Sequence, residues 1–171
     1  MNYFKLFQIE QKSEVDCKLL SYRFYKLQRQ FHPDHAMHLS QQKQKAMLKQ
    51  SIIINQGYKI LKNPFLRYQY LLSLYGFSLQ NKNHLKNKKK FLMEQFNLSE
   101  RFEIFQKNGY EINEFHNIKS FIHVKIKKYQ LQIQSELDKK QWNLAINTLY
   151  KLSFYQKKII DIQKIEIKLN I

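Results

Sequence analysis

The sequence is poor in the residues that build turns, disulfides and nucleotide-binding loops. Its 171 residues include three glycines, two prolines and one cysteine. A single cysteine excludes an internal disulfide and a paired-cysteine zinc knuckle, and so few glycines argue against a phosphate-cradling loop. No apolar run approaches the roughly 20 residues of a membrane-spanning helix, and the N-terminus resembles neither a signal nor a transit peptide. These absences indicate a reduced, cytoplasmic setting without a membrane partner.

Arginine is also scarce, although the chain is strongly basic. The formal net charge is +17, yet lysine supplies 26 of the 30 basic residues and arginine only four. Lysine, asparagine, isoleucine, phenylalanine and tyrosine share A/T-rich codons, so we attribute much of the charge to codon bias. Arginine is the residue whose guanidinium group donates two parallel hydrogen bonds to a phosphate or to the edge of a guanine base. A basic nucleic-acid-binding helical protein is therefore the less favoured alternative.

Apolar residues are plentiful, at 43% of the chain, and their spacing is helical. The first long segment has apolar residues three and four apart, which predicts a helix with one buried stripe. That stripe is Cys17, Leu20, Phe24, Leu27 and Phe31. Lys18, Tyr22, Tyr25, Lys26 and Arg29 form the opposite face. Ser13, with Asp16 three residues later, resembles an N-terminal cap, and Pro33 ends the helix.

A second long helix is predicted from Ser40 to about Asn63. Its inward residues would be Leu48, Ile54, Tyr58 and Leu61. Pro64 can open a further helix with Asn63 as its cap, and Gly76 can end it in the left-handed conformation. Two antiparallel helices with short flanking helices would make a first module over residues 1–76.

The remaining sequence predicts a linker and a second helical module. Residues 77–90 are rich in charge and lack apolar periodicity, so we assign them to a solvated linker. Beyond them, helices are expected over about 91–107, 113–137 and 141–169, forming a three-helix bundle over 91–171. No strand pattern stands out. The predicted fold is all-α, with two modules.

The corner between the first two long helices reads "HPDHAMH", residues 32–38, and three explanations compete for it. His32 and Asp34 resemble a general-base pair, but no serine or cysteine nucleophile stands at a recognisable elbow. His32, His35 and His38 are three apart, but Pro33 interrupts a helix there and no cysteine or glutamate completes a tetrahedral set. We therefore assign no catalytic residue, no metal and no cofactor.

A docking loop is the explanation that the position favours. Loops held by a rigid helical hairpin are common binding elements, and Pro33 restricts this one. Asp34 sits at its tip, after a helix with a basic face. A carboxylate flanked by basic side chains suits a partner that offers one arginine amid acidic surface.

Two known families resemble the two halves of the chain. Residues 1–75 resemble a J-domain through "NYFKLF", "YRFYKLQRQFHPD" and "INQGYKILKNPFLRYQYLL". The second half is similar to the C-terminal domain of the HscB co-chaperones through "FLMEQF" at 91–96 and "WNLAINTLYKLSF" at 142–154. The chain lacks the paired-cysteine module of some eukaryotic relatives, so the resemblance is to the bacterial type.

The resemblance implies a co-chaperone that is not itself an enzyme. It would stimulate the ATPase of HscA, a DnaK-class chaperone, with Asp34 pairing to an arginine of that partner. His32 and Pro33 would pack near the chaperone's interdomain linker. The implied chaperone-binding residues are His32, Pro33, Asp34, Lys26, Arg29 and Arg23.

The resemblance also implies a client, IscU, the scaffold on which iron–sulfur clusters are built. The implied client-binding residues are Leu92, Met93, Phe96, Glu100 and Phe154. Asn97 and Arg101 depart from the acidic residues expected around this patch. Apolar residues at this spacing are equally typical of core packing. A J-domain protein with another client is the second alternative.

Overall fold

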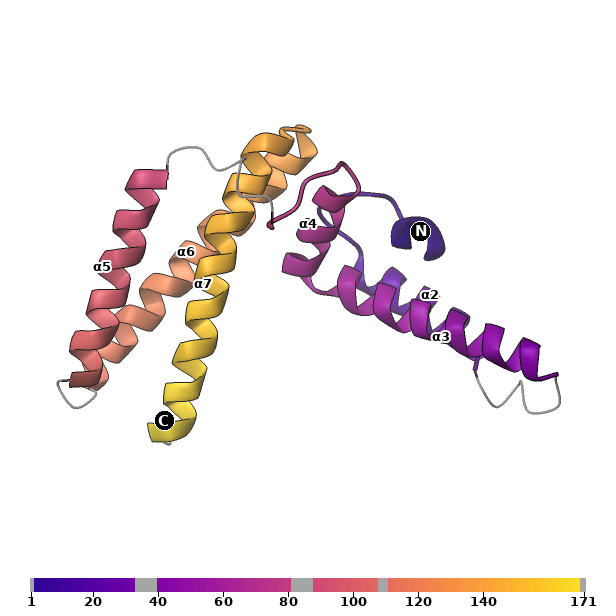
Figure 1. Cartoon of the computed structure of the whole chain (residues 1–171), viewed down its shortest axis with the longest axis horizontal. Coiled ribbons are helices and arrows are strands. Elements are labelled where there is room, and N and C mark those ends of the chain that lie inside the picture. The colour runs from indigo at the N-terminus through magenta and orange to yellow at the C-terminus, as the bar shows by residue number, and fades with distance from the viewer. Residues whose placement is uncertain (1, 33–39, 81–87, 108–110, 170–171) are drawn as a thin grey trace. The chain divides into compact units, whose positions relative to one another are not determined.

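The computed structural model describes residues 2–32, 40–80, 88–107 and 111–169. All regular secondary structure in these ranges is α-helical, as Figure 1 shows, which agrees with the predicted all-α class. The chain divides into two compact units, Met1–Leu74 and Tyr75–Ile171. None of the helices in these ranges combines the length and the apolarity needed to cross a membrane.

The first unit is a helical hairpin with short helices at its base. It contains α1 (Tyr3–Leu6), α2 (Cys17–Gln30), α3 (Gln41–Lys62) and α4 (Pro64–Ser73). The helices α2 and α3 lie side by side and run in opposite directions (Figure 1). The Phe24 and Tyr58 rings stack at 4.0 Å between centroids, and the Ser21 and Tyr58 hydroxyls are 3.1 Å apart. These contacts hold α2, whose basic face is the candidate docking surface.

The start of α2 differs from the sequence prediction in two respects. Asp16, not Ser13, is the N-cap, and its carboxylate accepts hydrogen bonds from the backbone N–H groups of Lys18 and Leu19. Ser13 is buried instead. Cys17 was assigned to the buried stripe but is exposed. It is the first helical residue after the cap, and the core covers this stripe fully only at Leu20 and Phe24.

Leu48 was also predicted to point inward, and this prediction is wrong because its side chain is 53% exposed. Antiparallel packing places Tyr58 opposite Ser21 and Phe24. Leu48 lies ten residues earlier on α3, level with the end of the much shorter α2. Ile54 and Leu61 are buried as expected.

The predicted junction between α3 and α4 is confirmed. The side chain of Asn63 accepts a hydrogen bond from the Leu66 N–H at 3.1 Å, and Pro64 is the first helical residue. The helix α4 ends at Ser73, with Leu74 as its C-cap, so it stops three residues before the predicted end at Gly76. Gly76 itself has a φ of +82°, the left-handed conformation expected of it. The buried Arg67 then joins three segments, donating to the carbonyl oxygens of Ser13 (2.8 Å) and Leu61 (2.6 Å).

The second unit is a three-helix bundle of α5 (Lys88–Lys107), α6 (Ile112–Asp138) and α7 (Trp142–Leu169). The helix α5 begins at Lys88, so residues 88–90, assigned to the linker from the sequence, are helical. The helices α6 and α7 pack along each other around a buried core (Figure 1). Its fully buried residues include Ile118, Ile122, Ile133, Ile146 and Tyr155. The exposure of Leu92, Met93 and Phe96 on α5 can therefore be compared with that of the residues in this core.

Candidate functional site

The outer face of α2 carries the basic residues predicted to meet a chaperone. Lys26 and Arg29 are exposed, and the exposed rings of Tyr22 and Tyr25 share the helix with them. Arg23 is half-buried, and its Nη1 donates to the Gln8 side-chain oxygen at 2.5 Å. A shallow groove of about 370 Å³ lies between the end of α1 and this part of α2. The side chains of Lys26 and Arg29 are thus available to a partner, whereas Arg23 lies at the edge of this basic face and is bonded to Gln8.

The corner after α2 lies mostly outside the described residues. His32 is exposed, two residues beyond the end of α2. Pro33, Asp34, His35 and His38 lie outside the described residues, so the docking-loop and metal-site hypotheses are not tested there. Within the described ranges, no three histidine, cysteine, aspartate or glutamate side chains gather as metal ligands would.

The α5 residues predicted to bind a client are exposed apolar side chains. Leu92 is 55% exposed, Met93 64% and Phe96 65%. The alternative that these three residues pack in the core is therefore wrong. The core-facing side of α5 consists instead of Phe91, Leu98, Phe102 and Phe105. We call Leu92, Met93 and Phe96 the apolar patch; an exposed apolar cluster of this kind is typical of a protein–protein contact.

The other two predicted client residues differ in exposure. Glu100 is exposed on α5, one helical turn beyond Phe96. Phe154 lies on α7 and is half-buried, because its ring packs edge-on against Phe91 with 5.8 Å between centroids. The Lys158 ammonium lies 5.9 Å from the Phe154 ring. Part of the Phe154 ring is therefore covered by Phe91, and Phe154 offers a partner less exposed surface than Phe96 does.

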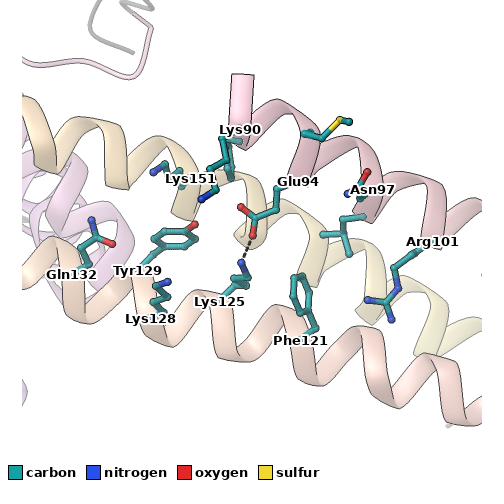
Figure 2. Close-up of a pocket in the computed structure, with 13 residues that line it drawn as sticks. Lys90, Glu94, Asn97, Arg101, Phe121, Lys125, Lys128, Tyr129, Gln132 and Lys151 are labelled. Carbon is teal, nitrogen blue, oxygen red and sulfur yellow. Dashed lines mark hydrogen bonds and ion pairs between the residues drawn. The ribbon is translucent and has the colours of Figure 1, made fainter. Parts of the chain in front are cut away.

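A groove of about 720 Å³ is lined by residues of α5, α6 and α7 (Figure 2). It adjoins the patch because Met93 also lines it. We call it the basic groove; its charged lining residues are Lys90, Glu94, Arg101, Lys125, Lys128 and Lys151. Asn97 and Arg101, the two departures from the expected acidic pattern, line this groove. Arg101 donates to the Glu114 carboxylate at 2.8 Å, so its charge is already paired within the bundle.

Among the described residues, Glu94 is the one acidic side chain that lines the basic groove. It forms an ion pair with Lys125, which Figure 2 shows as a dashed line. Burial alone would raise the pKa of the Glu94 carboxyl, but contacts with Lys125 and the Tyr155 hydroxyl and the charge of Lys151 outweigh it. The pKa of Glu94 therefore lies below its usual value, and the group is charged at neutral pH.

Comparison with known proteins identifies the family. Residues 87–163 match the family described as the HSCB C-terminal oligomerisation domain. The chain is 38% identical over 166 residues to the co-chaperone protein HscB of Buchnera aphidicola subsp. Acyrthosiphon pisum, covering 97% of this chain and 95% of that protein. The chain belongs to the HscB co-chaperone family. The resemblance noted in the sequence is thereby confirmed.

Solved structures of HscB proteins share the whole fold. The chaperone HscB from Vibrio cholerae is 31% identical, with a TM-score of 0.86 and 99% of each chain covered. The human co-chaperone protein HscB is 25% identical, with a TM-score of 0.88 over 98% of this chain and 83% of that chain. The predicted architecture, a J-domain hairpin followed by a helical bundle, is confirmed.

The sequence did not reveal the basic groove. Its charged residues come from positions 90–101, 125–128 and 151, which are far apart in the chain. Each lysine by itself is indistinguishable from the many solvated lysines of this sequence. The one available signal was the pair Asn97 and Arg101, which breaks the acidic pattern expected near the patch.

Proposed function

We propose that this protein is a co-chaperone of iron–sulfur cluster biogenesis that brings the scaffold IscU to the chaperone HscA and stimulates the HscA ATPase. The observation that carries this proposal is the exposed apolar patch on α5, in a chain of the HscB family. A cluster of neighbouring exposed apolar side chains is typical of a protein–protein contact. The first unit would contact the chaperone and the second the client.

The chaperone contact would be electrostatic. Lys26 and Arg29 are exposed on α2 and suit an acidic surface. Asp34 lies four residues beyond the end of that helix and would accept a forked hydrogen bond from an arginine of HscA. His32 and Pro33 would flank this contact, with Arg23 at its rim. HscA, not this protein, would carry out ATP hydrolysis.

The client contact would be mainly apolar. Fully burying a large apolar side chain contributes about 1.5–3 kcal/mol, and each patch residue exposes more than half of its surface. Leu92, Met93 and Phe96 together can then contribute about 3–5 kcal/mol to binding. Glu100 would add a polar contact at one end, and Phe154 a smaller apolar one. Holding chaperone and client on one chain raises the effective concentration of one for the other.

Replacing Asp34 with asparagine tests the chaperone assignment. The change removes a charge from the proposed arginine contact, and loss of such a partner costs about 2–5 kcal/mol. We expect Asp34→Asn to lower the stimulation of HscA ATP hydrolysis by more than tenfold, with IscU binding unchanged. Asp16→Asn is the matched control because asparagine caps a helix as well as aspartate does. Native stimulation by Asp34→Asn would contradict the assignment.

A matched pair of leucine substitutions tests the client assignment. Leu92 and Leu131 are 55% and 60% exposed, so replacing either with alanine should leave the fold intact. We expect Leu92→Ala to weaken IscU binding by about three- to tenfold in isothermal titration calorimetry, from the loss of about 1 kcal/mol of apolar contact. Leu131→Ala, on α6, should bind as the native protein does. Native stimulation of HscA with no IscU binding would indicate a J-domain protein with another client.

A further inference from the structure

The basic groove gathers more positive charge than its own acidic residue can neutralise. Five basic side chains among the described residues line it, from all three helices of the bundle (Figure 2): Lys90, Arg101, Lys125, Lys128 and Lys151. Glu94, the acidic residue among them, pairs with Lys125, and Arg101 pairs with Glu114 on α6. In the part of the chain that the structure describes, Lys90, Lys128 and Lys151 have no carboxylate within 4.0 Å.

These three lysines are not equivalent to lysines scattered over open surface. Lys90 and Lys128 are exposed at the groove. Their positive charges repel each other and that of Lys151. Lys151 is half-buried, with its ammonium 6.0 Å from the centre of the Phe91 ring and 5.8 Å from that of Tyr129. Confining like charges around a concave, partly apolar surface strengthens their field there. An anionic group entering the groove would relieve this repulsion.

We propose that the basic groove binds an acidic segment of a partner protein. The lining suits a polypeptide because the exposed Met93 and the half-buried Phe121 offer apolar contacts beside the positive charges. The groove also adjoins the apolar patch, since Met93 belongs to both. A protein that rests on the patch can therefore extend an acidic segment into the groove. This site is additional to the client and chaperone contacts proposed above, and its test below uses neither of those partners.

Nucleic acid fits this groove less well than an acidic protein segment does. A continuous phosphate backbone would run past the Glu94 carboxylate, which is negatively charged and lies among the cations. The single arginine of the groove, Arg101, is engaged with Glu114 and is not free to fork onto a phosphate. The cations without an ion pair are lysines, which act as point charges and suit separate carboxylates as well as phosphates.

Two double variants with the same change in charge separate the groove from the general basicity of the chain. Lys90→Glu/Lys128→Glu alters the groove, whereas Lys89→Glu/Lys127→Glu alters neighbouring exposed lysines on the same helices. The probe is a fluorescein-labelled peptide of ten glutamates, measured by fluorescence anisotropy in 100 mM salt. We expect the groove variant to bind the peptide at least tenfold more weakly than the native protein. The control variant should lose less than threefold.

Two outcomes would overturn the proposal. Equal losses in the two double variants would show that the peptide senses only diffuse charge. Tighter binding of a ten-nucleotide thymidine oligomer than of the peptide, weakened only in the groove variant, would assign the groove to nucleic acid instead. Circular dichroism verifies that each variant is folded. If the groove variant does not fold, the single changes Lys128→Gln and Lys127→Gln provide the same comparison, with about a threefold loss expected for Lys128→Gln alone and none for Lys127→Gln.

Discussion

Replacing Arg67 with methionine should loosen the first unit and leave the second unchanged. Arg67 is 5% exposed, and burial lowers the pKa of its guanidinium. Its Nε donates to the Ser13 carbonyl and its Nη1 to the Leu61 carbonyl. The Leu61 carbonyl belongs to the last turn of α3, where the helix itself supplies no donor. One side chain thus satisfies a loop carbonyl and a helix terminus together.

The expected size of the effect follows from these two hydrogen bonds. A hydrogen bond to a charged group contributes about 1.5–3 kcal/mol, and a buried carbonyl left without a partner costs about 1–3 kcal/mol. Methionine fills similar space and avoids the cost of burying a charge, which offsets part of the loss. We expect a net decrease of about 2–4 kcal/mol in the free energy of unfolding of the first unit.

Hydrogen–deuterium exchange with mass spectrometry is the suitable measurement because it reports each unit separately. A loss of 2–4 kcal/mol corresponds to a roughly 30- to 1,000-fold decrease in the protection of α3 and α4 amides. The α6 and α7 amides should exchange at native rates because they belong to the second unit. Arg29→Met, at an exposed position on α2, is the control. If α3 and α4 in Arg67→Met exchanged within threefold of native rates, the reasoning about Arg67 would be refuted.

Two further predictions concern the packing of α1 on α3 and the ion pair in the basic groove. A Cβ at Gly57 would lie 2.8 Å from the Tyr3 Cδ1, which is too close. Gly57→Ala should therefore lower the free energy of unfolding by about 1–3 kcal/mol, although alanine favours the helix more than glycine does. Thermal unfolding measures this change. An unchanged or higher midpoint would show that the Tyr3 ring moves aside freely. The pKa of the Glu94 carboxyl is lower in the folded protein than in the unfolded chain, where it is about 4.3, so the charged carboxylate stabilises the fold above that pH. This stabilisation is lost as the pH falls through the pKa of the folded protein. Glu94→Gln should therefore lower the free energy of unfolding by about 1 kcal/mol at pH 7, and by progressively less below about pH 4.3. Urea unfolding followed by Trp142 fluorescence measures this difference. A difference that does not change with pH would contradict this role of Glu94.

Most helices could be predicted because their signals are local. The break at Asn63 and Pro64 combines a cap with a residue that favours the first helical position, and both act within one turn of the chain. The errors occurred where a neighbouring element decides the outcome. Leu48 follows the helical period of α3, but little of the shorter α2 lies opposite to cover it. Cys17 follows the period of α2, but the core begins one turn later.

The candidate site shows the same division. The basic face of α2 follows from helical spacing alone, and its exposed Lys26 and Arg29 agree with that reasoning. Spacing could not distinguish an exposed patch from a core stripe at Leu92, Met93 and Phe96, because both repeat with the same period. Packing of the neighbouring helices against Phe91, Leu98 and Phe102 decides that these three face away from the core.

The amino-acid sequence by itself determined the helical class, the helix boundaries to within a few residues, and the family to which the chain belongs. These depend on period, caps and motifs, which are properties of neighbouring residues in one chain. Only the tertiary structure decided which apolar side chains stay exposed on α5 and that lysines from α5, α6 and α7 converge on one groove. Exposure and electric field depend on what lies opposite a residue in space, and residues 90, 128 and 151 become neighbours only when the bundle has formed.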